Sequence, residues 1–148
     1  MGEIPRSHPR YNSLIGRKLL TEAAKEGLLA DSALIAHGRG EAYDYLLGEQ
    51  TCESAERAIK QAAFLMKNAE NCVISLNGNA VALAAADLIR CAAVIGCPVE
   101  INIYYRTPER MAALLSRLEN VRNEVASGDA PSGWSGDWLR AVQEIQIL

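Results

Sequence analysis

The chain has 148 residues, of which 49% are hydrophobic and 22% charged, as expected for one globular domain with a single core. This length leaves no room for a second full domain. The formal net charge of −3 excludes the strongly basic surface typical of nucleic-acid-binding proteins, and no acidic tail is present.

The N-terminus and the cysteines give indications of the cellular location of the protein. Residues 1–6 lack the apolar segment that a signal peptide needs, and no later window approaches a membrane span without charge. We therefore expect a cytoplasmic protein with no membrane partner. The cysteines form no Cys-x-x-Cys pair and have no nearby histidines, so we expect reduced, buried thiols and no metal site; they are Cys52, Cys72, Cys91 and Cys97.

The first predicted helix begins close to the N-terminus. Ser7 is a candidate N-cap, Pro9 falls in the first turn, and the helix runs to about Glu26, where Gly27 stops it. Three polar residues are spaced three and then four apart and so share one face of this helix; they are Arg10, Ser13 and Arg17. This face is either the solvated side of an amphipathic helix or a site for anions.

Residues 34–48 contain the most suggestive motif. A short apolar run leads into a predicted loop in which Arg39 lies between Gly38 and Gly40, and a brief helix closed by Gly48 follows. Glycines let a ligand approach the backbone, and a guanidinium offers donors suited to phosphate or carboxylate. The motif is either a small anion site or a surface turn with a solvated arginine.

The next helix is predicted to begin at Thr51 and to continue to about Met66. Its small apolar residues suggest close packing against a sheet, and we expect Phe64 and Met66 in the core or at its edge; the small residues are Ala55, Ala58, Ala62 and Ala63.

After this helix the hydrophobic period changes. Residues 72–76 and 98–105 are predicted strands, and they are followed by helices over 80–95 and from Pro108 to about Glu119. Gly96 ends the first of these helices, and Thr107 caps the second. A strand, helix, strand, helix order predicts a right-handed βαβ unit with parallel strands.

Two polar segments follow the predicted strands, where parallel sheets collect their ligands. They are Asn77-Gly78-Asn79 and Arg106-Thr107. Amide groups, a glycine and a helix N-terminus favour an anion there, although Asn-Gly is also a common turn pair. The first segment is not a dinucleotide fingerprint and no P-loop lysine follows it, which disfavours a nicotinamide or P-loop site.

From Asn120 onward turn-forming residues dominate and periodicity is lost, until a last short helix is predicted over 138–148, with Leu139, Val142 and Ile145 on one side. Only two parallel strands are predicted, whereas parallel sheets usually have more strands and both faces covered. Either a partner chain supplies more sheet, or the fold is incomplete.

Four segments in this order resemble the archaeal phosphopantothenate synthetase family: residues 4–11, 34–48, 73–79 and 100–107. The resemblance runs from Ile4 to about Glu119. It implies an α/β fold with a Rossmann-like parallel sheet and a helical N-terminal segment. We therefore expect a family-like region 1–119, composed of a helical segment 1–69 and a βαβα unit 70–119, followed by a divergent, turn-rich tail 120–148.

The resemblance implies an ATP-dependent ligase of coenzyme A synthesis. Members condense 4-phosphopantoate with beta-alanine, release AMP and pyrophosphate through an acyl-adenylate, and work as homodimers; Mg2+ is expected with ATP. Arg17 and Arg39 match ATP-contacting arginines of the family. We infer five further candidates for the acid substrate or the phosphates, each with a structural role as the alternative: Arg10, His37, Asn77, Asn79 and Arg106. No catalytic nucleophile is identified.

The chain departs from the family after Glu119. Members continue into a further αβ half with an acidic segment resembling Pro-Leu-Glu-Asp-Gly-Asp-Arg, and nothing here matches it. The alternative to a ligase is therefore a truncated, non-catalytic fragment that binds anions and dimerises.

Overall fold

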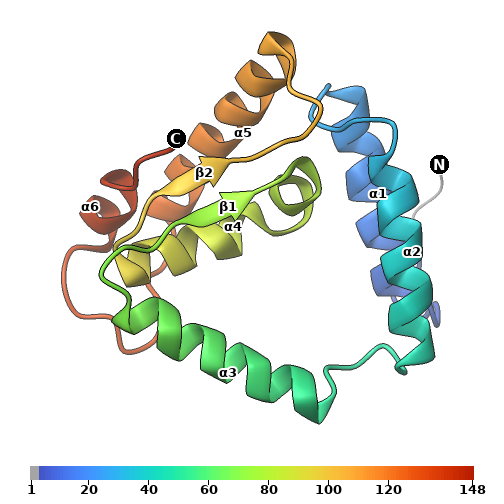
Figure 1. Ribbon diagram of the computed structural model, residues 1–148, viewed down its shortest axis with the longest axis horizontal. Coiled ribbons are helices and arrows are strands. Elements are labelled where there is room, and N and C mark those ends of the chain that lie inside the picture. Colours follow the sequence, from blue (N-terminus) through green and yellow to red (C-terminus); the bar gives the residue numbers. More distant parts are fainter. Residues whose placement is uncertain (1–3) are drawn as a thin grey trace.

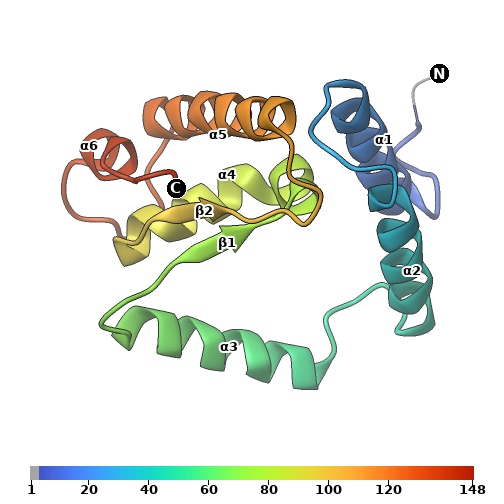
Figure 2. The ribbon, with the colours of Figure 1, turned by 45° about the horizontal axis from the view of Figure 1, so that its top comes forward.

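The computed structural model describes residues 4–148 (Figure 1). Its elements, in chain order, are α1 (Tyr11–Lys25), α2 (Ala33–Leu46), α3 (Glu53–Asn68), β1 (Ile74–Leu76), α4 (Gly78–Ile95), β2 (Val99–Ile101), α5 (Pro108–Ser127) and α6 (Trp138–Gln143). Helices α4, α5 and α6 lie together with the strands, while α1 and α2 lie side by side at one end (Figures 1 and 2). The α/β class is thus confirmed, with more helix than sheet.

Strands β1 and β2 are parallel, as predicted, with Ile74 opposite Val99 and Leu76 opposite Ile101. These four side chains are buried on one face of the sheet, because side chains alternate along a strand. On the other face the hydroxyl of Ser75, which is exposed, donates to a carboxylate oxygen of Glu100 at 2.9 Å. One face of the sheet therefore carries the core.

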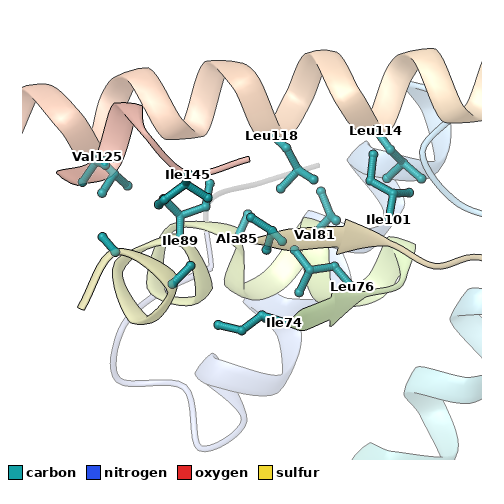
Figure 3. Close-up of a cluster of buried hydrophobic side chains, with 14 of the residues drawn as sticks. Ile74, Leu76, Val81, Ala85, Ile89, Ile101, Leu114, Leu118, Val125 and Ile145 are labelled. Carbon is teal, nitrogen blue, oxygen red and sulfur yellow. The ribbon is translucent and has the colours of Figure 1, made fainter. Parts of the chain in front are cut away.

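Helices α4 and α5 pack on that face and on each other (Figure 3). The largest fully buried side chains are Leu20, Leu76, Ile89, Val99, Leu114, Leu118 and Val142. Burying one such side chain contributes about 1.5–3 kcal/mol. Among the described residues, α4 alone is long and apolar enough to cross a membrane by length and composition. Here its apolar side, with Val81, Ala85 and Ile89, forms part of the core.

The end of the chain adds to the sheet. The amide of Val99 donates to the carbonyl of Gln146 at 2.9 Å, and the amide of Leu148 donates to the carbonyl of Val99 at 2.8 Å. Val99 and Ile147 form a parallel bridge. The predicted helix over 138–148 is therefore too long, because its last three residues pair with β2.

Two of the predicted helix ends are confirmed and two are wrong. Gly27 and Gly96 both adopt φ of +77° and end α1 and α4 as predicted, since glycine enters this left-handed region without strain. Helix α1 begins at Tyr11, so the predicted cap at Ser7 is wrong. Helix α5 continues to Ser127, so the predicted end at about Glu119 is also wrong.

The reason for the longer α5 is its apolar side. Val121, Val125 and Ala126 continue the helical spacing set by Leu114 and Leu118, and they pack into or against the core. Trp138 also holds this end of α5, because its indole N–H donates to the carbonyl of Val125 at 3.1 Å.

The glycine-flanked Arg39 lies inside a helix. Helix α2 runs without a break through Gly38 and Gly40 and ends beside Gly48, whose φ is +82°. The predicted loop is wrong, although Gly48 does mark the helix end. Interior glycines cost a helix about 1 kcal/mol each, and the packing of α2 on α1 and α4 outweighs that cost.

Helix α3 lies apart from the rest in both views of the ribbon (Figures 1 and 2). It has no buried residue, and Ile59, Phe64 and Leu65 are 57–61% exposed. The prediction that this helix packs against a sheet is therefore wrong, as is a core position for Phe64. Met66, which is partly buried against the core, lies at the core edge as predicted.

Candidate functional site

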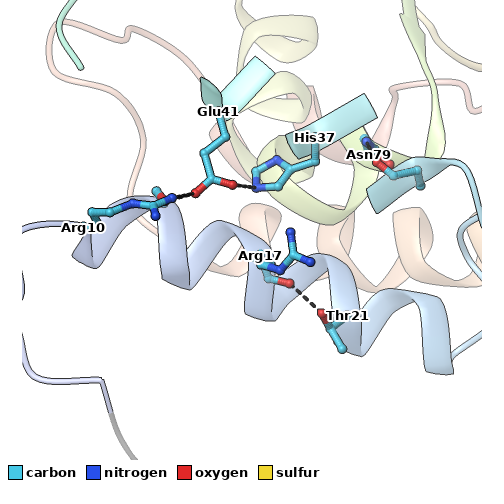
Figure 4. Close-up of polar contacts among 8 residues, drawn as sticks. Arg10, Arg17, Thr21, His37, Glu41 and Asn79 are labelled. Carbon is cyan, nitrogen blue, oxygen red and sulfur yellow. Dashed lines mark hydrogen bonds and ion pairs between the residues drawn. The ribbon is translucent and has the colours of Figure 1, made fainter. Parts of the chain in front are cut away.

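A polar cluster joins the start of α1 to α2. Arg10 and Ser13 each donate a hydrogen bond to a carboxylate oxygen of Glu41, and Nε2 of His37 lies 3.9 Å from the other oxygen (Figure 4). Helical spacing brings these side chains together, since residues three or four apart share a helix face. Two of the predicted candidates, Arg10 and His37, thus meet at one place.

Glu41 is the centre of this cluster, although the sequence analysis does not single it out. The Ser13 hydroxyl, and after it the Arg10 guanidinium, hold the pKa of the Glu41 carboxyl below its usual range, while partial burial opposes them. Its side chain is only 14% exposed, so a charged carboxylate is held between the two helices. The i, i+4 spacing from His37 was a usable signal, but only the packing of α1 on α2 supplies its partners.

We expect replacement of Glu41 with glutamine to lower the free energy of unfolding by about 1 kcal/mol at pH 7, because charge-assisted hydrogen bonds are lost. A lowered pKa means that the stabilisation is present above the ordinary glutamate value of about 4.3 and is lost as the pH falls through the lowered pKa. Urea unfolding of both proteins at pH 7 and pH 3 should therefore show a difference that shrinks in acid.

The control is Glu22→Gln on the exposed side of α1, where the carboxylate is 3.9 Å from Lys18 and the expected change is below about 0.5 kcal/mol. An equal loss for Glu41→Gln at both pH values would show that the carboxylate does not hold the helices by its charge.

His37 packs tightly against α1. A Cβ at Gly16 would lie 3.5 Å from Cε1 of the imidazole, so the glycine brings the ring close to the helix. Nε2 is buried and has no hydrogen-bond partner within residues 4–148. An unpaired buried nitrogen is costly, and a ligand oxygen would satisfy it.

Beside this cluster lies an open cavity of about 610 Å³, whose lining includes Arg6, His8, Arg10, His37, Glu41 and Asp44. Cationic and hydrogen-bonding groups therefore converge there with three carboxylates, of which Glu41 is already bonded to Arg10 and Ser13. Such a donor set suits a phosphate or a carboxylate.

The two arginines predicted to bind ATP lie on different sides of the helix pair. Arg17 lies on α1 and points toward α2, near His37 (Figure 4), while Arg39 is two positions from both His37 and Glu41 and so lies on the far side of α2. Both are exposed, and across residues 4–148 neither guanidinium makes an ion pair or hydrogen bond. Their role in ATP binding stays a prediction.

At the carboxyl end of β1 the polar residues have structural partners. Asn77 caps α4, because its side-chain oxygen accepts from the amide of Ala80 at 2.9 Å. Asn79 donates from Nδ2 to the carbonyl of Ala33 at 3.1 Å and so ties α4 to α2. Helix α4 begins at Gly78, two residues before its predicted start at Ala80, while ligand contact at this segment stays a prediction.

Gly78 does permit a close approach, but to the protein's own backbone. A Cβ at this position would lie 2.8 Å from the carbonyl oxygen of Leu28. A small cavity of about 170 Å³ still opens beside Asn77 and Asn79. Arg106 is exposed on the loop before α5. The predicted N-cap of α5 at Thr107 is confirmed, because its hydroxyl oxygen accepts a hydrogen bond from the amide of Arg110 at 3.2 Å.

No group of three or more histidine, cysteine or acidic side chains within residues 4–148 is arranged to hold a metal ion. The cysteines are free, but only Cys97 is buried as predicted, since Cys91 is exposed and Cys52 and Cys72 are half-buried. Burial, and after it the neighbouring Cys72, raises the pKa of the Cys97 thiol to about 11. This cysteine is therefore an inert core residue at neutral pH.

Comparison with known proteins gives consistent matches. The sequence profile of the phosphopantothenate/pantothenate synthetase family matches residues 54–135. The 4-phosphopantoate--beta-alanine ligase of Thermococcus onnurineus is 46% identical over 125 residues, which cover 84% of this chain and 48% of that protein. The ligase of Methanospirillum hungatei is 50% identical over 116 residues, which cover 78% of this chain and 48% of that protein. The ligase of Methanosarcina mazei is 41% identical over 119 residues, which cover 80% of this chain and 47% of that protein. The chain spans about half the length of the curated relatives it matches.

Proposed function

Because this chain belongs to the phosphopantothenate/pantothenate synthetase family, we propose that it acts in an ATP-dependent ligase that joins 4-phosphopantoate to beta-alanine. The product is 4'-phosphopantothenate, an intermediate of coenzyme A biosynthesis, and AMP and pyrophosphate are released. The observation that carries this proposal is the match to relatives named as such ligases over about four fifths of the chain.

The proposed reaction brings two anionic substrates together. The pantoate carboxylate attacks the α-phosphorus of ATP and expels pyrophosphate, and the beta-alanine amine then attacks the acyl carbon and displaces AMP. Since both substrates carry phosphate, fixed cations must offset their repulsion, and arginine remains charged throughout. In-line positioning supplies the rest of the rate enhancement, without a protein nucleophile.

We assign two residues by the family resemblance and two by their surroundings. Arg17 and Arg39 contact ATP, while Arg10 and His37 hold a phosphate or the acid beside Glu41. The cavity at the α1–α2 cluster and the unpaired Nε2 of His37 support the second assignment. Asn77, Asn79 and Arg106 remain weaker candidates, since the two asparagines already bond to the protein.

The proposal also covers the Mg2+ ion expected with ATP, the cellular location of the protein and its oligomeric state. Mg2+ is expected to accompany ATP, and within residues 4–148 no group of three or more histidine, cysteine or acidic side chains is arranged to hold a metal ion. We place the protein in the cytoplasm and propose that it works as a homodimer.

A second candidate follows from the length of the chain, which spans about half of these relatives. It is a fragment that binds the anionic substrates and dimerises but does not catalyse. The two candidates separate when the purified protein is incubated with Mg-ATP, 4-phosphopantoate and beta-alanine. A ligase forms AMP and 4'-phosphopantothenate in equal amounts, and only when all three substrates are present. Binding of ATP without AMP formation supports the fragment.

A further inference from the structure

The cavity at the α1–α2 cluster lies between two helix ends of opposite polarity. Helices α1 and α2 lie side by side and run in opposite directions, so the start of α1 and the end of α2 both line it (Figure 1). The start of a helix carries a partial positive charge. Arg6 and Arg10 add to this charge, and the first turn of α1 has no acidic residue. The side of the cavity that α1 contributes is therefore positive.

The end of α2 forms a negative side. A helix end carries a partial negative charge, the last turn of α2 has no basic residue, and Asp44 and Glu49 both line the cavity. Glu49 has a φ of +53°, a left-handed conformation that residues other than glycine rarely adopt, and its amide donates to the carbonyl of Asp44 at 3.0 Å. The chain thus turns back after α2 and brings the two acidic residues close together.

Three of the charged side chains in this cavity have no partner. Within residues 4–148, Arg6, Asp44 and Glu49 take part in no ion pair, whereas Arg10 is paired with Glu41. A ligand that is only an anion leaves the two carboxylates unmatched, and a ligand that is only a cation leaves Arg6 unmatched. These three side chains are therefore matched by a small ligand that carries both charges.

We propose that they bind the amino-acid substrate, the zwitterion beta-alanine, with its ammonium group at Asp44 and Glu49 and its carboxylate at Arg6. This assignment rests on the proposed function and names the place of its second substrate. The cavity, of about 610 Å³, has the size of a ligand pocket and also contains Arg10 and His37, to which the acid is assigned. The amine is thus held beside the carbonyl group that it attacks, while the unreactive carboxylate stays bound.

Two matched ligands test the role of the acidic residues. The probes are beta-alanine and propionate, which has the same carboxylate and carbon chain but no amine. NMR titrations of the isotope-labelled chain give both dissociation constants. We expect the wild-type chain to bind beta-alanine about fivefold more tightly than propionate, since each exposed ion pair contributes modestly. In the double variant Asp44→Asn, Glu49→Gln the two constants should agree within about twofold, because the partners of the amine are gone.

Two further variants serve as controls. Arg6→Gln should weaken both ligands about threefold and keep their ratio, because it removes only the partner of the carboxylate. Asp31→Asn removes an exposed acid from the connection at the other end of the helix pair and should leave both constants unchanged. All four substituted positions are exposed, so circular dichroism should show an unchanged fold.

The assignment would be overturned by a wild-type chain that binds beta-alanine no more tightly than propionate, or by a double variant that keeps the preference. A titration with Mg-ATP separates this failure from failure of the ligase. A chain that binds Mg-ATP but does not prefer beta-alanine overturns only the amino-acid site. A chain that shows the expected preference but binds no ATP supports the amino-acid site and contradicts the ligase.

Discussion

Replacing Arg17 with alanine should weaken Mg-ATP binding by about 10- to 100-fold, since a charge-assisted contact to phosphate contributes about 1.5–3 kcal/mol. The guanidinium is exposed and has no partner within residues 4–148, so its removal should leave the fold intact. The measurement is a calorimetric titration of each folded protein with Mg-ATP.

The control for Arg17 is the next residue, Lys18, whose ammonium nitrogen lies 3.9 Å from a carboxylate oxygen of Glu22. Lys18→Ala should leave the ATP affinity within about twofold, because its exposed ammonium interacts weakly with a distant anion. Arg39→Ala should also weaken binding about tenfold, even though Arg39 lies on the far side of α2. Unchanged affinity in both arginine variants would refute the assignment of these residues to ATP.

Replacing Gly78 with alanine should lower the free energy of unfolding by about 1–3 kcal/mol, the usual cost of overpacking. The new methyl carbon would lie 2.8 Å from the backbone oxygen of Leu28 and 2.8 Å from Cδ2 of Leu29. The leucine side chain can move, but the backbone of the α1–α2 connection must shift. Urea unfolding measures the change directly.

Gly38→Ala provides the matched control for Gly78. Gly38 lies inside α2, and a Cβ there would have no heavy atom within 4 Å. Alanine should therefore stabilise the protein by about 0.5–1 kcal/mol, since it favours helix over glycine. A destabilised Gly38→Ala protein would indicate that residues 38–40 are not helical. Equal effects at both positions would show that close packing at Gly78 is not the cause.

Local signals in the sequence predict the βαβ unit well. A β-branched run predicts β1, and Gly96 and Thr107 set the end of α4 and the start of α5, because these signals depend only on neighbouring residues. The same signals fail for α2. Two glycines within three residues indicate a loop, but contacts with α1 and α4 hold the helix together, and those contacts are not visible in the local sequence.

In the candidate site, too, local spacing is predicted from the sequence, whereas tertiary partners are not. The spacing of Arg10 and Ser13 predicts that they share a face, and the structure confirms that both bond to one carboxylate. Glu41 itself could not be selected, because its role depends on which side of α2 meets α1. Asn77 and Asn79 have the structural role given as the alternative: Asn77 caps α4 and Asn79 fastens it to α2, while a ligand contact of either amide stays a prediction.

The central claim is that this chain carries an ATP and phosphopantoate site of its family, and calorimetric titration with Mg-ATP tests it most directly. The titration is performed with and without saturating 4-phosphopantoate. We predict saturable ATP binding that the acid strengthens, because we assign both ligands to the cationic side chains of α1 and α2. A folded chain that binds neither ligand would contradict the claim.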